Sequence, residues 1–279
     1  LIVCATCDTT TFVWHLQSTE ESPAPTFIIG TQPAFTLALR SILIPGPTCT
    51  VQLLALGLDT GLVRLYSAAI RHSCPSEAGS DAMNQMMTCC STLAGHLDWV
   101  RCLDFLQLPD GCDSKHDIFL ASGSQDATLR IWHITVGSST NVEDTFSRVK
   151  ISEFSLDDIN FTVCLDSVLT GHDNWVTGVA WALAPGHKSG DSSPYQHICL
   201  LSASMDKSLV LWKPPCISNC TTSQSLGSIG MEEVNCPTVP TIWLEETRVG
   251  DVGGKNLGFL GCLWGPDAKV IFGIGFQVF

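Results

Sequence analysis

Positive charge is scarce in this sequence: 14 Lys and Arg residues stand against 27 Asp and Glu residues, and the formal net charge is −13. Binding to a nucleic-acid backbone depends on Lys and Arg side chains that displace counterions, so we do not expect direct nucleic-acid binding as the main role. Long apolar runs are also missing, since none approaches the roughly 18 residues that cross a bilayer. The composition is nevertheless 45% hydrophobic, which is enough for a large core and too apolar for a disordered chain.

Signatures of catalytic and metal sites are absent or incomplete. The sequence contains no Gly-x-Ser-x-Gly elbow and no His-Glu-x-x-His motif. The string VGGKN (252–256) fails as a phosphate loop, because Val249 stands where a Gly is needed and Asn256 where Ser or Thr is needed. Cys4 and Cys7 have metal-ligand spacing, but no second pair follows at matching spacing. We therefore expect no catalytic residue, no cofactor and no metal.

The 14 cysteines are too dilute for a small disulfide-stapled domain, and many lie inside apolar runs, as Cys102, Cys164, Cys199 and Cys262 do. We expect most of them to be small buried thiols in a reducing compartment. The chain starts without a basic segment, a cleavage site or an initiator Met and reads as the middle of a strand. We therefore expect it to be a piece of a longer protein.

One unusual string occurs twice in the sequence. LAGHLDWVRCLDF (93–105) and LTGHDNWVTGVAW (169–181) share a Leu, a Gly-His pair and a Trp-Val pair. Each is followed by a second shared string, LASGSQDATLRIW (120–132) or LLSASMDKSLVLW (200–212). In both of these, a Ser stands two residues before an Asp, and a Trp stands six residues after it. The chain is therefore built from repeats.

Two further copies are less complete. VCATCDTTTFVW has the same frame with Thr6, Asp8 and Trp14. LALGLDTGLVRLY ends in Tyr66 where the other copies have Trp, and its register around Asp59 and Thr60 stays open. In every copy an Asp-containing turn separates two β-rich runs, which predicts a hairpin. The alternating strings WVRCLDF and WVTGVAW predict a strand before each hairpin, and MTCCSTL and FTVCLDSVL predict a fourth.

Repeated units of four antiparallel strands are typical of a β-propeller. Gly-His followed about thirty residues later by Ser-x-Asp-x5-Trp resembles the WD40 repeat. This resemblance implies an all-β fold, a partial WD40 propeller with about three complete blades and two incomplete ones. The hairpin strings, together with WLEETRVGDVGGKNLGF, also resemble the family of second subunits of the Elongator complex. That resemblance runs from residue 1 to about 275.

We expect one partial propeller domain over residues 1–279, with blade pieces at 1–30, 31–93, 94–169, 170–248 and 249–279. Asp59, Asp126 and Asp206 stand 67 and 80 residues apart, whereas a minimal repeat is about 40 to 45 residues long. The excess falls in polar stretches that we interpret as inserts, at 71–85, 137–160, 184–196 and 214–237. Long surface loops are tolerated because the closure entropy grows only logarithmically with length.

The WD40 resemblance implies a hydrogen-bonded tetrad in each complete repeat. In the first, Trp132 would donate to Ser124, Ser124 to His96 and His96 to Asp126. The second tetrad would contain the equivalent residues Trp212, Ser204, His172 and Asp206. A buried Asp and a buried His are costly unless they are paired. Each closed set would therefore tie the loop before strand one to the hairpin between strands two and three.

Ser, His and Asp are also the residues of a hydrolase triad. Two observations favour the structural interpretation: the set occurs twice with the same offsets, and the nucleophile elbow is missing. Beside the same loops lies a candidate partner surface, because Trp and Arg are common anchors of protein interfaces. Its residues are Trp99, Arg101, Gln125, Trp175, Thr177 and Met205. The alternative for Trp99 and Trp175 is packing between blades.

The family resemblance implies a non-catalytic assembly subunit of Elongator, which modifies the wobble uridine (U34) of tRNAs and is linked to transcription elongation by RNA polymerase II. The implied partners are the large scaffold subunit and the catalytic acetyltransferase-like subunit. We expect the cytoplasm as the location, with the nucleus as a second one, and no role at membranes. Two alternatives stay open: a WD40 adaptor of a ubiquitin-ligase or signalling complex, and a Ser-His-Asp hydrolase.

Overall fold

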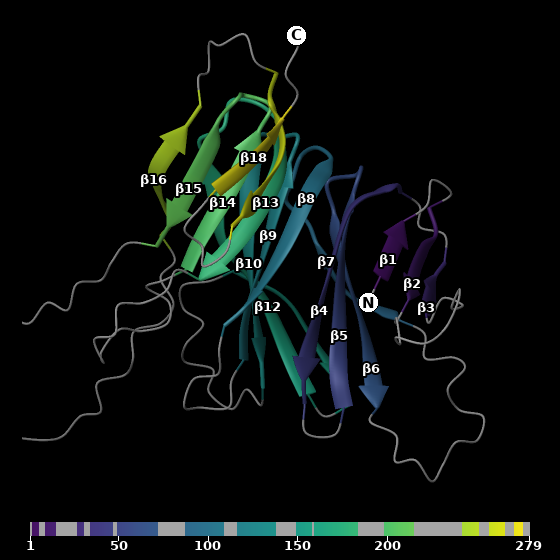
Figure 1. Cartoon of the computed structure of the whole chain (residues 1–279). Helices are drawn as coiled ribbons and strands as arrows, with labels where there is room; N and C mark the ends of the chain where they lie inside the picture. The colour runs from purple at the N-terminus through teal and green to yellow at the C-terminus, as the bar shows by residue number, and fades with distance from the viewer. Residues whose placement is uncertain are drawn as a thin grey trace, which may run out of the picture.

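The computed structural model describes most of the chain as β-strands that form antiparallel sheets (Figure 1). The described residues are 2–5, 9–14, 27–30, 34–46, 49–71, 87–108, 116–137, 149–157, 159–183, 198–214, 242–250, 257–265 and 271–275. Within these ranges every regular element is a strand, as the repeat pattern predicts, and no helix is long and apolar enough to span a bilayer.

Five sheets follow one another in chain order. The first has three strands: β1 (Ile2–Ala5), β2 (Thr11–Trp14) and β3 (Phe27–Ile29). The second has four: β4 (Thr36–Pro45), β5 (Cys49–Leu58), β6 (Val63–Arg71) and β7 (Thr88–Leu93). In Figure 1 the first sheet lies on the right and the second next to it.

The third sheet has five strands, in the order β11, β12, β10, β9, β8. Their bounds are β8 (Val100–Gln107), β9 (His116–Ser124), β10 (Thr128–Val136), β11 (Val149–Leu156) and β12 (Ile159–Thr170). The fourth consists of β13 (Val176–Leu183), β14 (Ile198–Ser204), β15 (Leu209–Lys213) and β16 (Leu244–Val249). The fifth pairs β17 (Phe259–Trp264) with β18 (Ile271–Gly275).

The strand β11 corrects one expectation, because it lies inside the stretch 137–160 that we interpreted as a polar insert. Its sequence, VKISEFSL, alternates between apolar and polar residues, as a strand covered on one face does. Its apolar side chains, Ile151, Phe154 and Leu156, pack against the core between the second and third sheets. Its Ser152 also contacts Ser91 of β7, with 2.6 Å between the hydroxyl oxygens. The strand thus joins two sheets. The other three inserts lie almost wholly outside the described residues.

The core is divided among the interfaces between consecutive sheets. Side chains of the second and third sheets share one cluster, with Leu53, Leu103 and Trp132 among its members. Phe119 and Leu200 belong to a second cluster, between the third and fourth sheets, and smaller clusters lie at the other two interfaces. The second strands are therefore covered on both faces, and β14 is buried at every residue. This explains their nearly continuous apolar sequences.

The first strands of the sheets lie next to one another, with β8 in contact with both β4 and β13. Asp104 on β8 holds this arrangement through its carboxylate, which accepts the backbone N–H of Trp181 at 2.8 Å and lies 3.5 Å from Nε of Arg40. The indole N–H of Trp264 donates to the carbonyl of Ala180 at 2.9 Å, which links the fourth sheet to the fifth. Sheets in chain order around adjacent first strands form part of a β-propeller.

Candidate functional site

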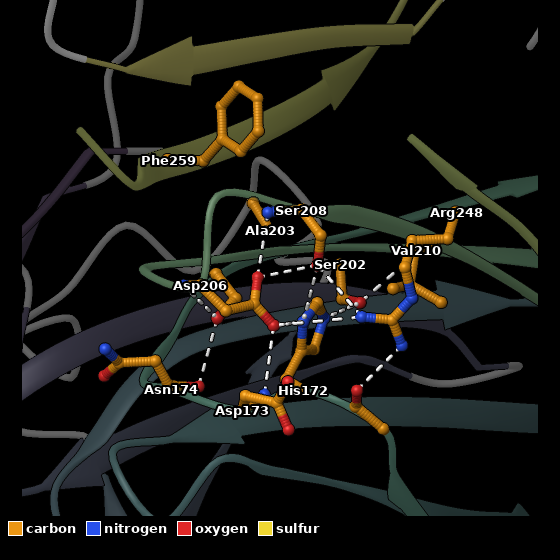
Figure 2. Close-up of polar contacts among 12 residues, drawn as sticks. His172, Asp173, Asn174, Ser202, Ala203, Asp206, Ser208, Val210, Arg248 and Phe259 are labelled. Carbon is orange, nitrogen blue, oxygen red and sulfur yellow. Dashed lines mark hydrogen bonds and ion pairs between the residues drawn. The ribbon is translucent and has the colours of Figure 1, made fainter. Parts of the chain in front are cut away.

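The polar residues of each repeat come from three places in one blade. His96 lies in the loop before β8, Asp126 lies in the turn between β9 and β10, and Trp132 lies on β10. In the next blade, the same places hold His172, Asp206 and Trp212. In each blade the second strand pairs antiparallel with the third. This pairing brings the Asp of the turn and the Trp of the third strand close to the loop that carries the His. Figure 2 shows Ser202 and Asp206 of the fourth sheet gathered around His172.

The first tetrad is a continuous chain of hydrogen bonds. The indole Nε1 of Trp132 donates to Oγ of Ser122 at 3.0 Å, and this Oγ lies 2.9 Å from Nε2 of His96. The other ring nitrogen, Nδ1, lies 2.9 Å from Oδ2 of Asp126. Because a carboxylate only accepts, Nδ1 of the imidazole carries a proton and donates to Asp126, while Nε2 faces the serine hydroxyl.

The second tetrad repeats this geometry with equally short contacts. Trp212 donates to Ser202 at 2.8 Å, Ser202 lies 2.7 Å from Nε2 of His172, and Nδ1 of His172 lies 2.8 Å from Oδ2 of Asp206. The imidazole side chains of both tetrads have no exposed surface. Each set is therefore closed to water, as the cost of burying these groups requires.

The serine assignment was wrong in both tetrads: Ser122 and Ser202 are the members, and Ser124 and Ser204 are not. Ser124 Oγ donates instead to the carbonyl of Asp98 at 2.9 Å, and Ser204 Oγ donates to that of Asn174 at 3.0 Å. The physical reason lies in the strand register. Trp132 pairs with Leu120 on the neighbouring strand, so the nearest serine on the same face is Ser122, two residues further along. Ser124 lies two residues beyond Ser122, at the edge of the turn.

Each carboxylate has partners that the sequence did not reveal. Oδ2 of Asp126 accepts the backbone N–H of Leu97, and Oδ1 accepts the hydroxyl of Thr128 at 2.7 Å. Asp206 has the equivalent bonds from the N–H of Asp173 and the hydroxyl of Ser208. A hydroxyl residue two positions after each Asp is the signal that could have indicated this fifth member.

Each tetrad also has an arginine, which arrives from a different strand in each blade. Arg130 of β10 donates to the carbonyl of Gly95 at 2.7 Å. In the next blade, Arg248 of β16 donates to the equivalent carbonyl of Gly171 at 2.7 Å and is held by Glu245. Figure 2 shows Arg248 beside Asp206 and Ser208. The common acceptor is the carbonyl that precedes the His. The shared repeat therefore does not predict the arginine.

Hydrogen bonding keeps both carboxylates ionised. Burial alone would raise the pKa of Asp126, but the bonds from His96, Leu97 and Thr128 outweigh it and hold the pKa well below its usual value. The pKa of Asp206 is lowered by the same balance, through Ser208 and His172. Burial lowers the pKa of His172, although Asp206 opposes this effect. The second tetrad therefore contains a neutral imidazole beside a carboxylate.

The second sheet has the turn of a repeat without its tetrad. Asp59 donates its N–H to the carbonyl of Phe35, as Gln125 does to Trp99 and Met205 to Trp175. This equivalence settles the register that the sequence left open: Thr60 stands where the other blades have Asp126 and Asp206. Two further tetrad positions are occupied by Leu56 and Tyr66, which are both buried.

In the third copy of the frame, Thr6 and Asp8 lie outside the described residues, as does the side chain of Trp14. The repeat frame at the start of the chain therefore stays a prediction.

Five of the six candidate partner-surface residues lie around the same loops and stay candidates. Trp99 and Trp175 have 42% and 43% of their surface exposed, so neither is fully packed between blades. The residues of intermediate exposure are Arg101, Gln125 and Met205. Thr177 is different, because its hydroxyl donates to the carbonyl of Phe259 at 2.6 Å and thus links β13 to β17. We therefore remove Thr177 from the surface.

The described cysteines are all free thiols, and most are buried or partly buried; they are Cys49, Cys89, Cys90, Cys102, Cys164, Cys199 and Cys262. Of the adjacent pair, Cys89 is exposed, whereas Cys90 is partly buried and donates to the carbonyl of Leu65. In the part of the chain that the structure describes, no three His, Cys, Asp or Glu residues are grouped to hold a metal. Cys7 lies outside that part, and so does the side chain of Cys4.

Ser122, His96 and Asp126 have the order of a hydrolase triad, but their surroundings do not suit the chemistry. Ser122 is fully buried and its oxygen already accepts the indole N–H of Trp132. A substrate carbonyl cannot approach this oxygen without displacing the core around it. The other candidate nucleophile, Ser124, donates to a backbone carbonyl and not to the imidazole. The arrangement is suited to fixing the geometry of a blade.

Comparison with known proteins agrees with this architecture. Residues 87–133 and 163–213 match the family described as WD domain, G-beta repeat. Proteins called Elongator complex protein 2 are similar along 99% of this chain: the zebrafish (Danio rerio) protein is 32% identical over 280 residues, the Drosophila melanogaster protein 32% over 292, and the human protein 30% over 283. The chain spans 28%, 31% and 28% of the length of these three relatives.

Proposed function

Because this chain is a WD40-repeat protein that resembles Elongator complex protein 2 along almost its entire length, we propose that it acts as a non-catalytic scaffold in the Elongator complex. The observation that carries the proposal is the pair of closed tetrads. They place the Ser-His-Asp sets of both blades inside the core, where they stabilise the loops and leave those loops free to contact other proteins.

The proposed partners are the large scaffold subunit and the catalytic acetyltransferase-like subunit of that complex. The chemistry of wobble-uridine modification, and the main contact with tRNA, would belong to the catalytic partner. The charge of this chain supports this division of labour, because a net charge of −13 repels phosphate. The proposed link to RNA polymerase II transcription would also operate through the assembled complex.

The test is affinity purification of the intact protein from its own cells, followed by mass spectrometry. We expect the other Elongator subunits to be enriched together and in constant ratio. Enrichment of a ubiquitin ligase or of signalling proteins in their place would contradict the proposal and favour the other adaptor role.

The hydrolase alternative has its own test. An activity-based fluorophosphonate probe should leave all four serines of the two repeats unlabelled, while a known serine hydrolase in the same tube reacts. The four serines are Ser122, Ser124, Ser202 and Ser204. Stoichiometric labelling of any of them would refute the non-catalytic role.

We propose the cytoplasm as the principal location, with the nucleus as a second one. Support comes from the seven described cysteines, all of which are free thiols, as expected of a reducing compartment. Fluorescence imaging of the tagged intact protein tests this proposal. Accumulation in the secretory pathway would contradict it.

A further inference from the structure

Each of the three consecutive blades places one exposed aromatic side chain directly before its first strand. Phe35, Trp99 and Trp175 occupy equivalent positions, since the backbone carbonyl of each accepts the N–H of a residue in the hairpin turn of its own blade. Their exposed fractions are 50%, 42% and 43%. Aromatic rings that are half open to water at the same position of successive blades form a repeated feature of one end of the molecule.

The loops that carry these rings lie next to one another from blade to blade. The turn of the second sheet lies against the His96 loop, because a Cβ added to Gly61 would come within 2.6 Å of the His96 carbonyl oxygen. One blade further, a Cβ on Gly123 would come within 2.6 Å of the side chain of Val176, which follows Trp175. The three rings therefore lie on neighbouring loops at one end of the sheets.

A carboxylate accompanies each ring. Oδ1 of Asp59 accepts the backbone N–H of Phe35 at 3.1 Å, and Oδ1 of Asp98 accepts that of Trp99 at 2.8 Å. In the next blade Asn174 accepts the N–H of Trp175, and the exposed Asp173 adds the negative charge. We call these six residues the aromatic-acidic row: Phe35, Asp59, Trp99, Asp98, Trp175 and Asp173.

We propose that the aromatic-acidic row binds an extended segment of a partner protein that carries spaced arginine or lysine side chains. A guanidinium group can stack on an aromatic face and pair with a carboxylate at the same time. Of the nearby positive charges, Arg248 interacts with Asp173 but is already paired with Glu245. The other two, Arg101 and Lys207, are fewer than the three carboxylates of the row, and the chain as a whole has a net charge of −13. Electrostatic complementarity therefore favours a basic partner over an acidic one or a nucleic acid.

The row offers substitutions that remove charge and keep the loop geometry. Asn174 already does in the fourth sheet what Asp98 does in the third, since each accepts the N–H of the following Trp. Asp98→Asn therefore retains the acceptor and removes only the charge, and Asp59→Asn does the same for Phe35. Asp173→Asn completes a triple variant that should fold as the parent does, which an unchanged melting temperature would verify.

The probe is a fluorescein-labelled peptide with four arginines separated by Gly-Ser pairs, and its control has Gln in place of every Arg. Anisotropy is measured with the intact purified protein in low and high salt. We expect the arginine peptide to bind at least about 10-fold more tightly than the control, and to bind less tightly in high salt. Equal binding of the two peptides, or tighter binding of a single-stranded RNA oligonucleotide, would overturn the proposal.

The triple Asn variant should lose about 10-fold in affinity for the arginine peptide, and Trp99→Leu with Trp175→Leu should also weaken binding when salt has screened the charges. Unchanged affinity in the triple variant would refute the row as the site. The inference rests on the proposed scaffold role, yet the two can fail separately. If Elongator subunits still co-purify but the peptide does not bind, the row is refuted and the scaffold role stands; the reverse pattern refutes only the scaffold role.

Discussion

Replacing His172 with Ala tests whether a tetrad contributes to stability as its geometry implies. The side chain of Asp206 is only 2% exposed and would lose its 2.8 Å bond to the imidazole. A hydrogen bond to a charged group contributes about 1.5–3 kcal/mol. The buried hydroxyl of Ser202 would also lose the imidazole as its acceptor and keep only the Val210 carbonyl at 3.5 Å, a loss that costs about 1–3 kcal/mol. We therefore expect His172→Ala to lower the free energy of unfolding of the intact protein by about 3–5 kcal/mol, which corresponds to a melting temperature about 10 °C lower.

Two milder variants separate hydrogen bonding from the loss of volume. His172→Asn can place an amide N–H where Nδ1 donates to Asp206, so about half of the loss should be recovered. Trp212→Phe keeps a ring in the core but removes the 2.8 Å bond to Ser202, and it should cost about 1 kcal/mol. Urea unfolding followed by circular dichroism provides the free energies. A loss below about 1 kcal/mol for His172→Ala would refute the reasoning, since that value is typical of an exposed side chain.

The same tetrad predicts that the protein loses stability in acid. The pKa of His172 is lowered from its ordinary 6.5, so below pH 6.5 the unfolded chain takes up a proton that the folded chain does not, and stability falls. The pKa of Asp206 is lowered from 3.8, so a second loss begins below that pH. Urea midpoints of the parent should therefore fall between pH 6.5 and 5, and those of His172→Asn should fall less. A midpoint that rises in this range would contradict the sign of the His172 effect.

Three further predictions concern the surface, the thiols and a turn. Trp99→Ala should weaken the capture of partners in co-purification while the melting temperature stays the same; undiminished capture would count against this surface. Burial raises the pKa of the Cys90 thiol to about 12. Iodoacetamide at pH 8 should therefore modify the exposed Cys89 first, which peptide mass spectrometry would show; faster reaction of Cys90 would contradict its burial. Gly61 has a φ of +79° and leaves no room for a Cβ beside the His96 carbonyl. Gly61→Ala should therefore lower the free energy of unfolding by more than about 1 kcal/mol. A urea titration measures this loss, and an unchanged free energy would contradict the prediction.

Much of the architecture could be predicted from spacing alone. The paired strings around His96 and His172 predicted the strands on either side, because alternation and an Asp turn are local properties. The serine could not be chosen in this way, since Ser122 and Ser124 lie two residues apart on one strand and share a face. Only the pairing of Trp132 with Leu120 decides between them, and that register is a property of the folded sheet.

Other features depend on contacts that are distant in sequence. Arg248 reaches the carbonyl of Gly171 from a strand that follows a long polar stretch, so no repeat offset could have indicated it. The strand β11 was missed because polar residues surround its short alternating run, and its apolar face finds a partner only when the neighbouring sheet is in place. Thr177 was misjudged for the same reason: its hydrogen bond crosses to the next sheet.

The blade without a tetrad gives the molecule an uneven response to acid. The third and fourth sheets contain Asp126, His172 and Asp206, whose pKa values are lowered. At the tetrad positions the second sheet has Thr60 in the turn and the buried side chains of Leu56 and Tyr66. At these positions the second sheet has no His or Asp side chain to take up a proton, and apolar packing does not change charge. As the pH falls, the blades that contain Asp126 and His172 should loosen while the sheet of β4 to β7 persists, so hydrogen exchange at low pH should show protection that remains longest in that sheet.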